Sequence, residues 1–158
     1  MAQEIERKFL VATDAWRAQV DQGTAYRQGY IATVVAGQSV RVRIAGDTGL
    51  ITVKGPTTGL TRAEFEYPIP LADAAEMLNT LCMRPLIEKT RYLLTIDAVV
   101  WEIDVFHGDN EGLIVAEVEL EAVDQEVALP DWIGAEVSAD PRYFNSSLVD
   151  HPFSSWAD

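Results

Sequence analysis

Charged side chains alternate with apolar ones at the start of this chain, in a segment that has the composition of a β-strand. In the stretch E-I-E-R-K-F, Glu4, Glu6 and Lys8 occupy every second position. Successive side chains of a strand point to opposite faces, so these three share one face, and Ile5 and Phe9 lie on the other. The two carboxylates would stand about 6–7 Å apart and repel each other by roughly 2–3 kcal/mol at an effective dielectric constant of about 20. Such a pair is harmless in water, but in an enclosed space it requires a cation.

The same period-two pattern recurs in eight runs that are bounded by Gly, Pro and Asp. These runs predict strands at residues 3–11, 25–34, 38–45, 49–54, 61–69, 86–96, 99–106 and 113–122. The turns between them, such as Ala36-Gly37, are short enough for antiparallel hairpins or slightly longer loops. A meander, in which each strand pairs with the next, is the simplest topology.

One clear helix signal interrupts the strands. In PLADAAEMLNTLC, the apolar side chains fall on one helical face, and Pro70 suits the first turn of a helix. This face consists of Leu71, Ala74, Ala75, Leu78, Leu81 and Cys82. Shorter helices are expected in TDAWRAQV, after Thr13, and in the tail PRYFNSSLVD, where Pro141 opens the helix. The expected class is therefore mainly β with flanking helices (α+β).

Residue parity places the charged side chains of each expected strand on one face. The members of this face are Arg41 and Arg43; Thr52 and Lys54; Arg62, Glu64 and Glu66; Lys89 and Arg91; Glu102 and Asp104; and Glu117, Glu119 and Glu121. A half-buried sheet with one face in water would explain the alternation. However, carboxylates dominate the first, seventh and eighth strands, and basic groups dominate the third, fourth and sixth. This sorting, with Arg outnumbering Lys, favours the recognition of an anion by groups that converge on it.

Eight antiparallel strands can close into a barrel that is wide enough for one small ligand. With the charged face inward, the lumen would place an acidic patch beside a basic patch, and the helices would cover the apolar exterior. Carboxylate oxygens suit Mg²⁺ or Mn²⁺, and guanidinium and ammonium groups suit phosphate oxygens. The sequence therefore predicts an eight-stranded antiparallel closed β-barrel whose charged lumen suits a polyanion bridged to a divalent metal.

The overall composition limits the domain count and the partners. With 158 residues, of which 48% are hydrophobic, a single domain over residues 1–158 is expected. The formal net charge of −13 argues against nucleic acid or an anionic membrane as a partner, because both normally require a basic surface. The single cysteine, Cys82, excludes an internal disulfide. Without a signal-peptide pattern or an apolar run of ~20 residues, a cytoplasmic location is expected.

Short charged motifs follow one another in order along the chain. They are E-I-E-R-K at 4–8, R-Q-G-Y at 27–30, R-V-R at 41–43, K-G at 54–55, E-K-T-R-Y at 88–92, E-I-D at 102–104 and E-V-E at 117–119. This series resembles the CYTH superfamily of triphosphate tunnel metalloenzymes, and the tail D-P-R-Y-F-N-S-S-L is similar to the C-terminal helix of that family. The resemblance implies an eight-stranded tunnel that binds a triphosphate with divalent metal and, in most members, hydrolyses it.

The resemblance also implies roles for individual residues. The expected metal ligands, for Mg²⁺ or Mn²⁺, are Glu4, Glu6, Glu117 and Glu119. The expected triphosphate ligands are Lys8, Arg41, Arg43, Lys54, Lys89 and Arg91, with Arg62 as a further phosphate contact. Groups that support these ligands or hold a second metal are Glu64, Glu66, Glu102 and Asp104. Glu4, Glu6 and Lys8 are the candidate catalytic residues, since Lys8 and a neighbouring carboxylate can orient the attacking water.

The predicted activity is the metal-dependent hydrolysis of inorganic triphosphate to pyrophosphate and phosphate, in a monomer or homodimer. Class IV adenylate cyclases and thiamine triphosphatases share the tunnel, but they often carry Q-x-D-x-Y-F-D where this chain has R-Q-G-Y-I-A-T. A hydrolase or cyclase that acts on ATP or thiamine triphosphate, and a non-catalytic polyphosphate-binding module, are the alternatives. Arg7 is expected outside the barrel in a surface ion pair. The tryptophans are expected to pack in the core instead of binding a base.

Overall fold

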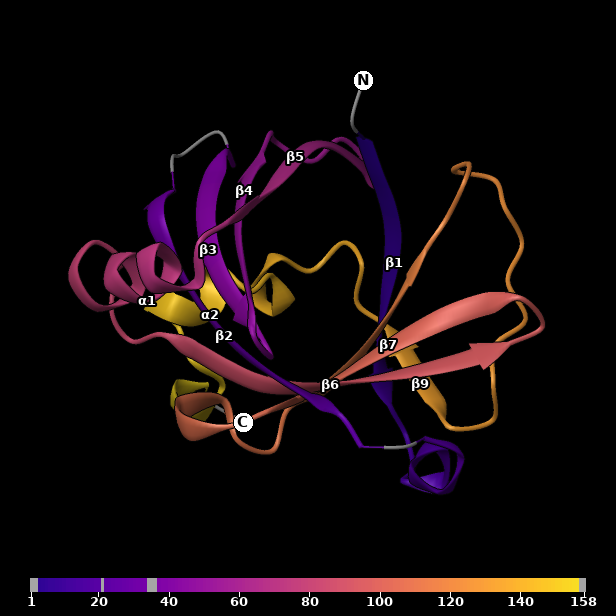
Figure 1. Ribbon diagram of the computed structural model, residues 1–158. Coiled ribbons are helices and arrows are strands. Elements are labelled where there is room, and N and C mark those ends of the chain that lie inside the picture. Colours follow the sequence, from indigo (N-terminus) through magenta and orange to yellow (C-terminus); the bar gives the residue numbers. More distant parts are fainter. Residues whose placement is uncertain (1–2, 21, 34–36, 157–158) are drawn as a thin grey trace.

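The computed structural model describes residues 3–20, 22–33 and 37–156, which form a β-barrel with short helices around it (Figure 1). In this part of the chain the strands are β1 (Gln3–Val11), β2 (Thr24–Thr33), β3 (Ser39–Ala45), β4 (Thr48–Lys54), β5 (Thr61–Ile69), β6 (Ile87–Ile96), β7 (Val99–Phe106), β8 (Ile114–Glu119) and β9 (Ile133–Glu136). The α-helices are α1 (Leu71–Thr80) and α2 (Ser147–Asp150), and the 3-10 helices are η1 (Ala15–Gln19), η2 (Gly108–Asn110), η3 (Pro141–Tyr143) and η4 (Phe153–Ser155). All eight predicted strands are present, although residues 34 and 36 of the expected strand end and turn lie outside the described residues.

The strands β1 to β8 close the barrel in the antiparallel order β5-β4-β3-β2-β6-β7-β8-β1, and β1 completes it by pairing with β5. The simple meander is wrong at two places. β1 pairs with β8 and β5 instead of β2, and β6 pairs with β2 instead of β5. The connections through η1 and α1 explain both departures, because each carries the chain past its neighbouring strand to another part of the sheet.

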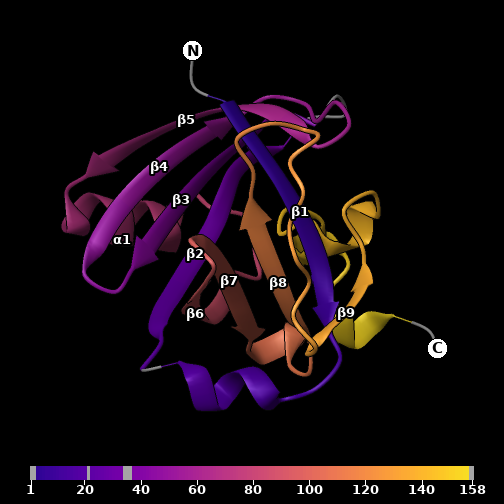
Figure 2. The same cartoon turned by 90° about the vertical axis from the view of Figure 1, so that its right-hand side faces the viewer.

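One edge of β1 is shared by two strands, as Figure 2 shows from the side. The start of β1 pairs with β5, and its end pairs with β9. The strand β9 was not predicted, because it has only four residues and includes Gly134, which weakens a strand pattern. Its Glu136 accepts hydrogen bonds from Arg7 Nε at 3.1 Å and Nη2 at 2.8 Å. Arg7 therefore lies outside the barrel in a surface ion pair, as predicted.

Two hydrophobic clusters cover the outer face of the barrel. The first lies under α1, where Leu78 packs near Val42 of β3. The second covers β1, β7 and β8 and is built around Trp16, Trp101 and Trp132. These tryptophans pack in the core, as expected from the sequence. No helix among the described residues is long and apolar enough to cross a membrane.

Two residues of the apolar face expected for α1, one at each end of the helix, are exposed to solvent. Leu71 and Leu81 are 44% and 58% exposed, because one begins the helix and the other follows its last residue. Cys82 is buried just beyond the helix, against Gly29 of β2. A Cβ atom at Gly29 would stand 2.7 Å from Cys82 Cβ, which is shorter than van der Waals contact. Glycine therefore allows the chain after α1 to approach β2.

The C-terminal segment fills one end of the barrel. Tyr143, Leu148 and Val149 cluster with Ile87 of β6 and Val115 of β8, whose parity directs them into the lumen. The segment is yellow in Figure 1, and its residues 141–150 form the 3-10 helix η3 and the four-residue α2 instead of one helix over the whole stretch. This end of the lumen is therefore apolar, and the charged side chains lie beyond it.

Candidate functional site

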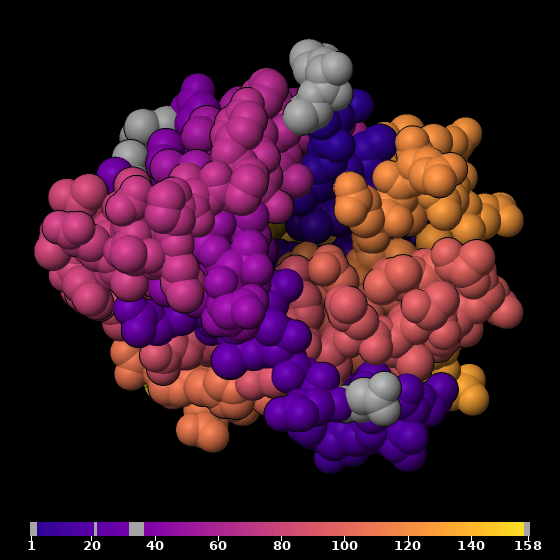
Figure 3. Space-filling view, in the orientation of Figure 1, coloured from indigo at the N-terminus to yellow at the C-terminus, as the bar shows by residue number. Residues whose placement is uncertain are grey.

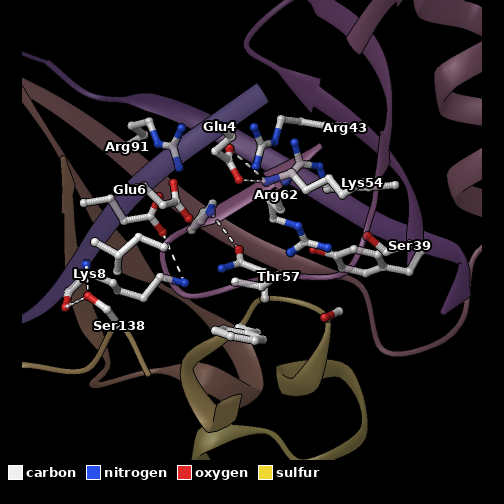
Figure 4. Close-up of a pocket in the computed structure, with 18 of the residues that line it drawn as sticks. Glu4, Glu6, Lys8, Ser39, Arg43, Lys54, Thr57, Arg62, Arg91 and Ser138 are labelled. Carbon is white, nitrogen blue, oxygen red and sulfur yellow. Dashed lines mark hydrogen bonds and ion pairs between the residues drawn. The ribbon is translucent and has the colours of Figure 1, made fainter. Parts of the chain in front are cut away.

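A polar cavity occupies the lumen and encloses about 780 Å³ of empty space, including its solvent-open mouth. Figure 3 shows a hollow between β1, in indigo, and the purple strands. Seven basic side chains of the described residues border the cavity: Lys8, Arg41, Arg43, Lys54, Arg62, Lys89 and Arg91. Glu4, Glu6 and Glu117 border it as well, and the first two project from β1 (Figure 4). The charged faces of the strands thus point into the barrel, as parity predicted.

Opposite charges lie beside each other in the cavity wall. Lys8 of β1 lies opposite Glu117 of β8, and Lys8 Nζ is 3.4 Å from the Glu117 Oε1 atom. Lys54 Nζ donates to both carboxylate oxygens of Glu4, at 2.9 and 3.1 Å. No ion pair within the described part of the chain involves Glu6. Glu6 is therefore the cavity carboxylate whose negative charge is least compensated.

These three carboxylates differ in acidity. Burial opposes the ionisation of Glu117, but nearby cations, led by Lys8, lower its pKa to about 2. Burial also opposes the ionisation of Glu4, yet the charge and hydrogen bonds of Lys54 contribute to a net lowering of its pKa. Burial, followed by the charges of Glu117 and Glu4, raises the pKa of Glu6 to about 8. A cation near Glu6 would favour its ionised form.

A second charged network joins β6 to β7. Arg91 donates from Nε and Nη2 to the two oxygens of Asp104, at 2.7 and 2.8 Å. Lys89 Nζ lies 2.7 Å from Asp104 Oδ2, and Arg91 Nη1 donates to Glu102 at 2.9 Å. Burial of Asp104 opposes its ionisation, but Lys89 and Arg91 hold its pKa well below the usual range. Asp104 therefore anchors two basic cavity residues.

Burial and neighbouring positive charges lower the pKa of two basic residues in this region. Burial, assisted by the charges of Arg91 and Arg43, lowers the pKa of Lys89 to about 7 against the opposing effect of Asp104. Burial and the adjacent charges of Arg41 and Arg91 lower the pKa of Arg43 to about 10. A bound anion would stabilise the protonated form of both groups.

Two further arginines border the cavity and keep N–H donors that no described residue accepts. Arg41 is 7% exposed, and its Nη2 donates to Thr52 Oγ1 at 3.3 Å and lies 3.5 Å from Glu66. Its buried Nε has no hydrogen-bond partner among the described residues. Arg62 donates to two glycine carbonyl oxygens, at 2.9 and 3.0 Å, which orient its guanidinium, and it forms no ion pair with another described residue. Both arginines retain capacity to bind an anion.

The remaining acidic candidates support the basic residues. Each of four carboxylates is ion-paired with a basic cavity residue: Glu64, Glu66, Glu102 and Asp104. Glu119 shares the parity of Glu117, but it ends β8, is exposed and does not border the cavity. Its role as a metal ligand stays a prediction.

Over residues 3–20, 22–33 and 37–156, no three His, Cys, Asp or Glu side chains form a ready-made metal site. Glu4 and Glu117 are instead turned toward lysines. The donor set still fits a hard divalent cation, because three carboxylates border one cavity and Glu6 has no ion-pair partner there. Such a cation would compete with Lys54 and Lys8 for these carboxylates.

Several neutral cavity residues were not predicted. Tyr30 of β2 borders the cavity, and Gln28 is buried on the same inner face, where it accepts from Arg43. Arg27 faces outward and donates to Asn79 of α1 at 3.4 Å. Strict parity on either side of Gly29 would have found the inward pair. The remaining ones come from β3, loops and the tail: Ser39, Thr57, Ser138, Asn145 and Ser146. The loop and tail residues lack any strand pattern that could have marked them.

Comparison with known proteins agrees with this geometry. A model of the CYTH domain matches residues 2–151, which is nearly the whole chain. The chain belongs to the CYTH domain family. The match includes the tail that fills the end of the barrel, so this segment is part of the CYTH domain as well.

Curated relatives of this CYTH protein are similar over nearly their full length. An inorganic triphosphatase of Acetivibrio thermocellus is 48% identical over 158 residues, which cover 100% of both chains. An inorganic triphosphatase of Nitrosomonas europaea is 38% identical over 149 residues, which cover 92% of this chain and 96% of the relative. A crystal structure of an inorganic triphosphatase superposes with a TM-score of 0.65 and 35% identity, covering 92% of this chain and 96% of the other.

Proposed function

We propose that this CYTH protein hydrolyses inorganic triphosphate to pyrophosphate and phosphate with a divalent metal ion. The observation that carries the proposal is the convergence of seven basic side chains and three carboxylates on one lumen cavity. A triphosphate is a compact polyanion, and basic groups must neutralise it before a nucleophile can approach. Two relatives named inorganic triphosphatase, at 48% and 38% identity, support the same substrate.

The basic residues of the cavity would bind the phosphates from several sides. Arg41 borders the cavity and offers Nη1, which is not fully buried and has no hydrogen-bond partner among the described residues. Arg62 offers a guanidinium whose hydrogen bonds, within the described part of the chain, go to backbone oxygens. The other ligands in the proposal are Lys8, Arg43, Lys54, Lys89 and Arg91. Few apolar side chains of the described residues border the cavity: Tyr30, Leu60 and Phe144. An adenosine or thiamine group would therefore find little apolar surface, which favours inorganic triphosphate over organic triphosphates.

Triphosphate tunnel enzymes are divalent-metal dependent. Here Glu4, Glu6 and Glu117 would hold Mg²⁺ or Mn²⁺. When bound, the ion would supply neutralisation of phosphate charge and a lower pKa for water. Lys8 is held by Glu117 and by the carbonyl oxygen of Tyr143, which accepts from Lys8 Nζ at 3.1 Å.

The pKa of Lys8 is raised, because Glu117 and Glu6 outweigh the effect of burial. As an ammonium group, Lys8 would donate to the substrate or orient the attacking water toward the terminal phosphorus. Glu4 and Glu6 complete the proposed catalytic group. Glu64, Glu66, Glu102 and Asp104 would fix the basic ligands through their ion pairs.

The net charge of −13 supports a protein with no nucleic-acid or membrane partner, and the free Cys82 is in keeping with a cytoplasmic location. A monomer or homodimer is sufficient for the proposed activity, since the described residues of one chain supply the cavity.

The decisive experiment measures phosphate release from tripolyphosphate, ATP and thiamine triphosphate, each with Mg²⁺ or Mn²⁺, together with cyclic AMP. We expect a higher kcat/KM for tripolyphosphate than for either organic substrate, and no release in chelator. Equal or better turnover of ATP or thiamine triphosphate, or formation of cyclic AMP, would move the function to an organic triphosphate. Binding of tripolyphosphate without phosphate release would identify a binding module.

A further inference from the structure

The C-terminal segment supplies part of the cavity surface through Phe144, Asn145 and Ser146. Its position is fixed by the buried side chains of α2 and by Lys8, which donates to the carbonyl oxygen of Tyr143. In Figure 4 this segment lies beneath the charged side chains. The tail therefore presents neutral polar groups directly to the site where the basic residues converge.

Asn145 links two basic residues that come from different strands. Its Oδ1 atom accepts hydrogen bonds from Lys89 Nζ at 2.8 Å and from Gln28 Nε2 at 2.9 Å. Gln28 Oε1 in turn accepts from Arg43 Nε at 2.7 Å. Gln28 and Lys89 are only 0% and 2% exposed, so these bonds are shielded from water. A short chain of amides thus connects Arg43 of β3 to Lys89 of β6.

The donors at the two ends of this hydrogen-bond network fix the orientation of the Gln28 and Asn145 amide groups. The guanidinium of Arg43 and the ammonium form of Lys89 can only donate hydrogen bonds. Gln28 must therefore turn its oxygen to Arg43 and its NH₂ group to Asn145, and Asn145 must turn its oxygen to both donors. Neither amide can be flipped without placing two donors face to face.

This orientation leaves the NH₂ group of Asn145 free. Its Nδ2 atom donates to no described residue, and it is not one of the buried side-chain atoms that lack a partner. Asn145 borders the cavity and its Nδ2 atom is not fully buried, so its N–H donors remain available to a bound anion. A neutral donor can bind a phosphate oxygen without adding to the repulsion among Lys89, Arg43 and Arg91.

We propose that Asn145 is a substrate-binding residue that contacts the triphosphate through its NH₂ group while its oxygen positions Lys89 and, through Gln28, Arg43. This inference rests on the proposed function, because it assumes that the anion in the cavity is a triphosphate. It assigns the tail a direct part in substrate binding, in addition to filling the end of the barrel.

The experiment compares Asn145→Ala and Asn145→Asp with the parent, in calorimetric binding of tripolyphosphate and in KM and kcat with Mg²⁺. Asn145→Ala should raise Kd and KM by about 5- to 20-fold, because one hydrogen bond to phosphate and two positioning bonds are lost. Asn145→Asp keeps the acceptor for Lys89 and Gln28 but replaces the donors by a negative charge. It should therefore bind more weakly than Asn145→Ala, although it disturbs the fold less.

The control is Asn79→Ala, whose amide accepts from Arg27 outside the barrel. We expect parental Kd, KM and kcat for this variant. A folded Asn145→Ala protein with parental Kd and KM would overturn the inference, as would Asn145→Asp binding as tightly as the parent. If Asn145→Ala does not fold, the nearly isosteric Asn145→Asp decides the question. A parent that neither binds nor cleaves tripolyphosphate would instead refute the proposed function, so the two failures are distinguishable.

Discussion

Replacing Glu6 by Gln should stabilise the metal-free protein at alkaline pH. Burial and the charges of Glu117 and Glu4 raise the pKa of Glu6 from 4.5 to about 8 in the folded state. The folded protein therefore holds this proton more tightly than the unfolded chain does. The resulting stability is fully present below pH 4.5 and is lost as the pH rises through about 8. Gln cannot ionise, so the Glu6→Gln protein should not show this loss.

The pKa difference sets the magnitude of the effect. At ~1.4 kcal/mol per pKa unit, the change from 4.5 to about 8 gives an upper limit of about 5 kcal/mol. Glu6 is half-buried, and solvent reduces the effect, so we expect roughly 2–4 kcal/mol. For a domain of this size, such a difference shifts the melting temperature by about 5–15 °C.

Urea unfolding of the parent and Glu6→Gln, in chelator at pH 5 and pH 8.5, measures this difference. At each pH we subtract the unfolding free energy of the parent from that of Glu6→Gln. Both proteins share all other titrating groups, so a change in this difference between pH 5 and pH 8.5 reports on Glu6. The two proteins should be similar at pH 5, and Glu6→Gln should be more stable at pH 8.5. A stability difference that is the same at both pH values would refute the assignment of an uncompensated carboxylate to this position.

Three further expectations concern the metal, the arginines and the packing of α1. Millimolar Mg²⁺ should raise the melting temperature of the chelator-treated parent, because metal at 100 times its Kd adds about 2.7 kcal/mol to the free energy of unfolding. The Glu4→Gln/Glu6→Gln protein should lose most of this response. A parent whose melting temperature does not change would count against the metal site. Arg43→Ala should weaken tripolyphosphate binding about ten- to a hundredfold, since charge-assisted bonds are worth roughly 1.5–3 kcal/mol. Arg7→Ala, outside the barrel, should bind normally in the same titration, and an equal loss would contradict the assignment of strand faces. Gly29→Ala should destabilise the fold by ~1–3 kcal/mol in urea unfolding, because its Cβ has no room, and unchanged stability would contradict that packing.

The inward-facing residues of the barrel strands could be predicted from the sequence because side-chain alternation is a local property of each strand. A strand has a side-chain period of two, so the alternation of Glu4, Glu6 and Lys8 defines a face without knowledge of the strand partners. Sorting of charge by strand then indicated that these faces converge. The cavity residues and the closed barrel confirm both steps.

The features that were missed depend on contacts between distant segments. The pairing of β6 with β2, and the insertion of β9 beside β1, are set by how η1, α1 and the tail pack, and no local pattern encodes them. Asn145 lies 117 residues from Gln28 in sequence, and their hydrogen bond exists only after the tail fills the barrel. Glu119 has the parity of Glu117 but ends β8 and is exposed, so parity alone does not decide whether a residue borders the cavity.

A crystal structure with tripolyphosphate and Mn²⁺, with anomalous diffraction recorded from the manganese, tests the central claim most directly. The anomalous signal should lie in the lumen beside Glu4, Glu6 and Glu117, and the phosphates should contact Arg41 and Arg43 within the same cavity. Phosphate and manganese bound together on the outer surface, with the lumen free of both, would contradict the assignment of the charged strand faces as a triphosphate site.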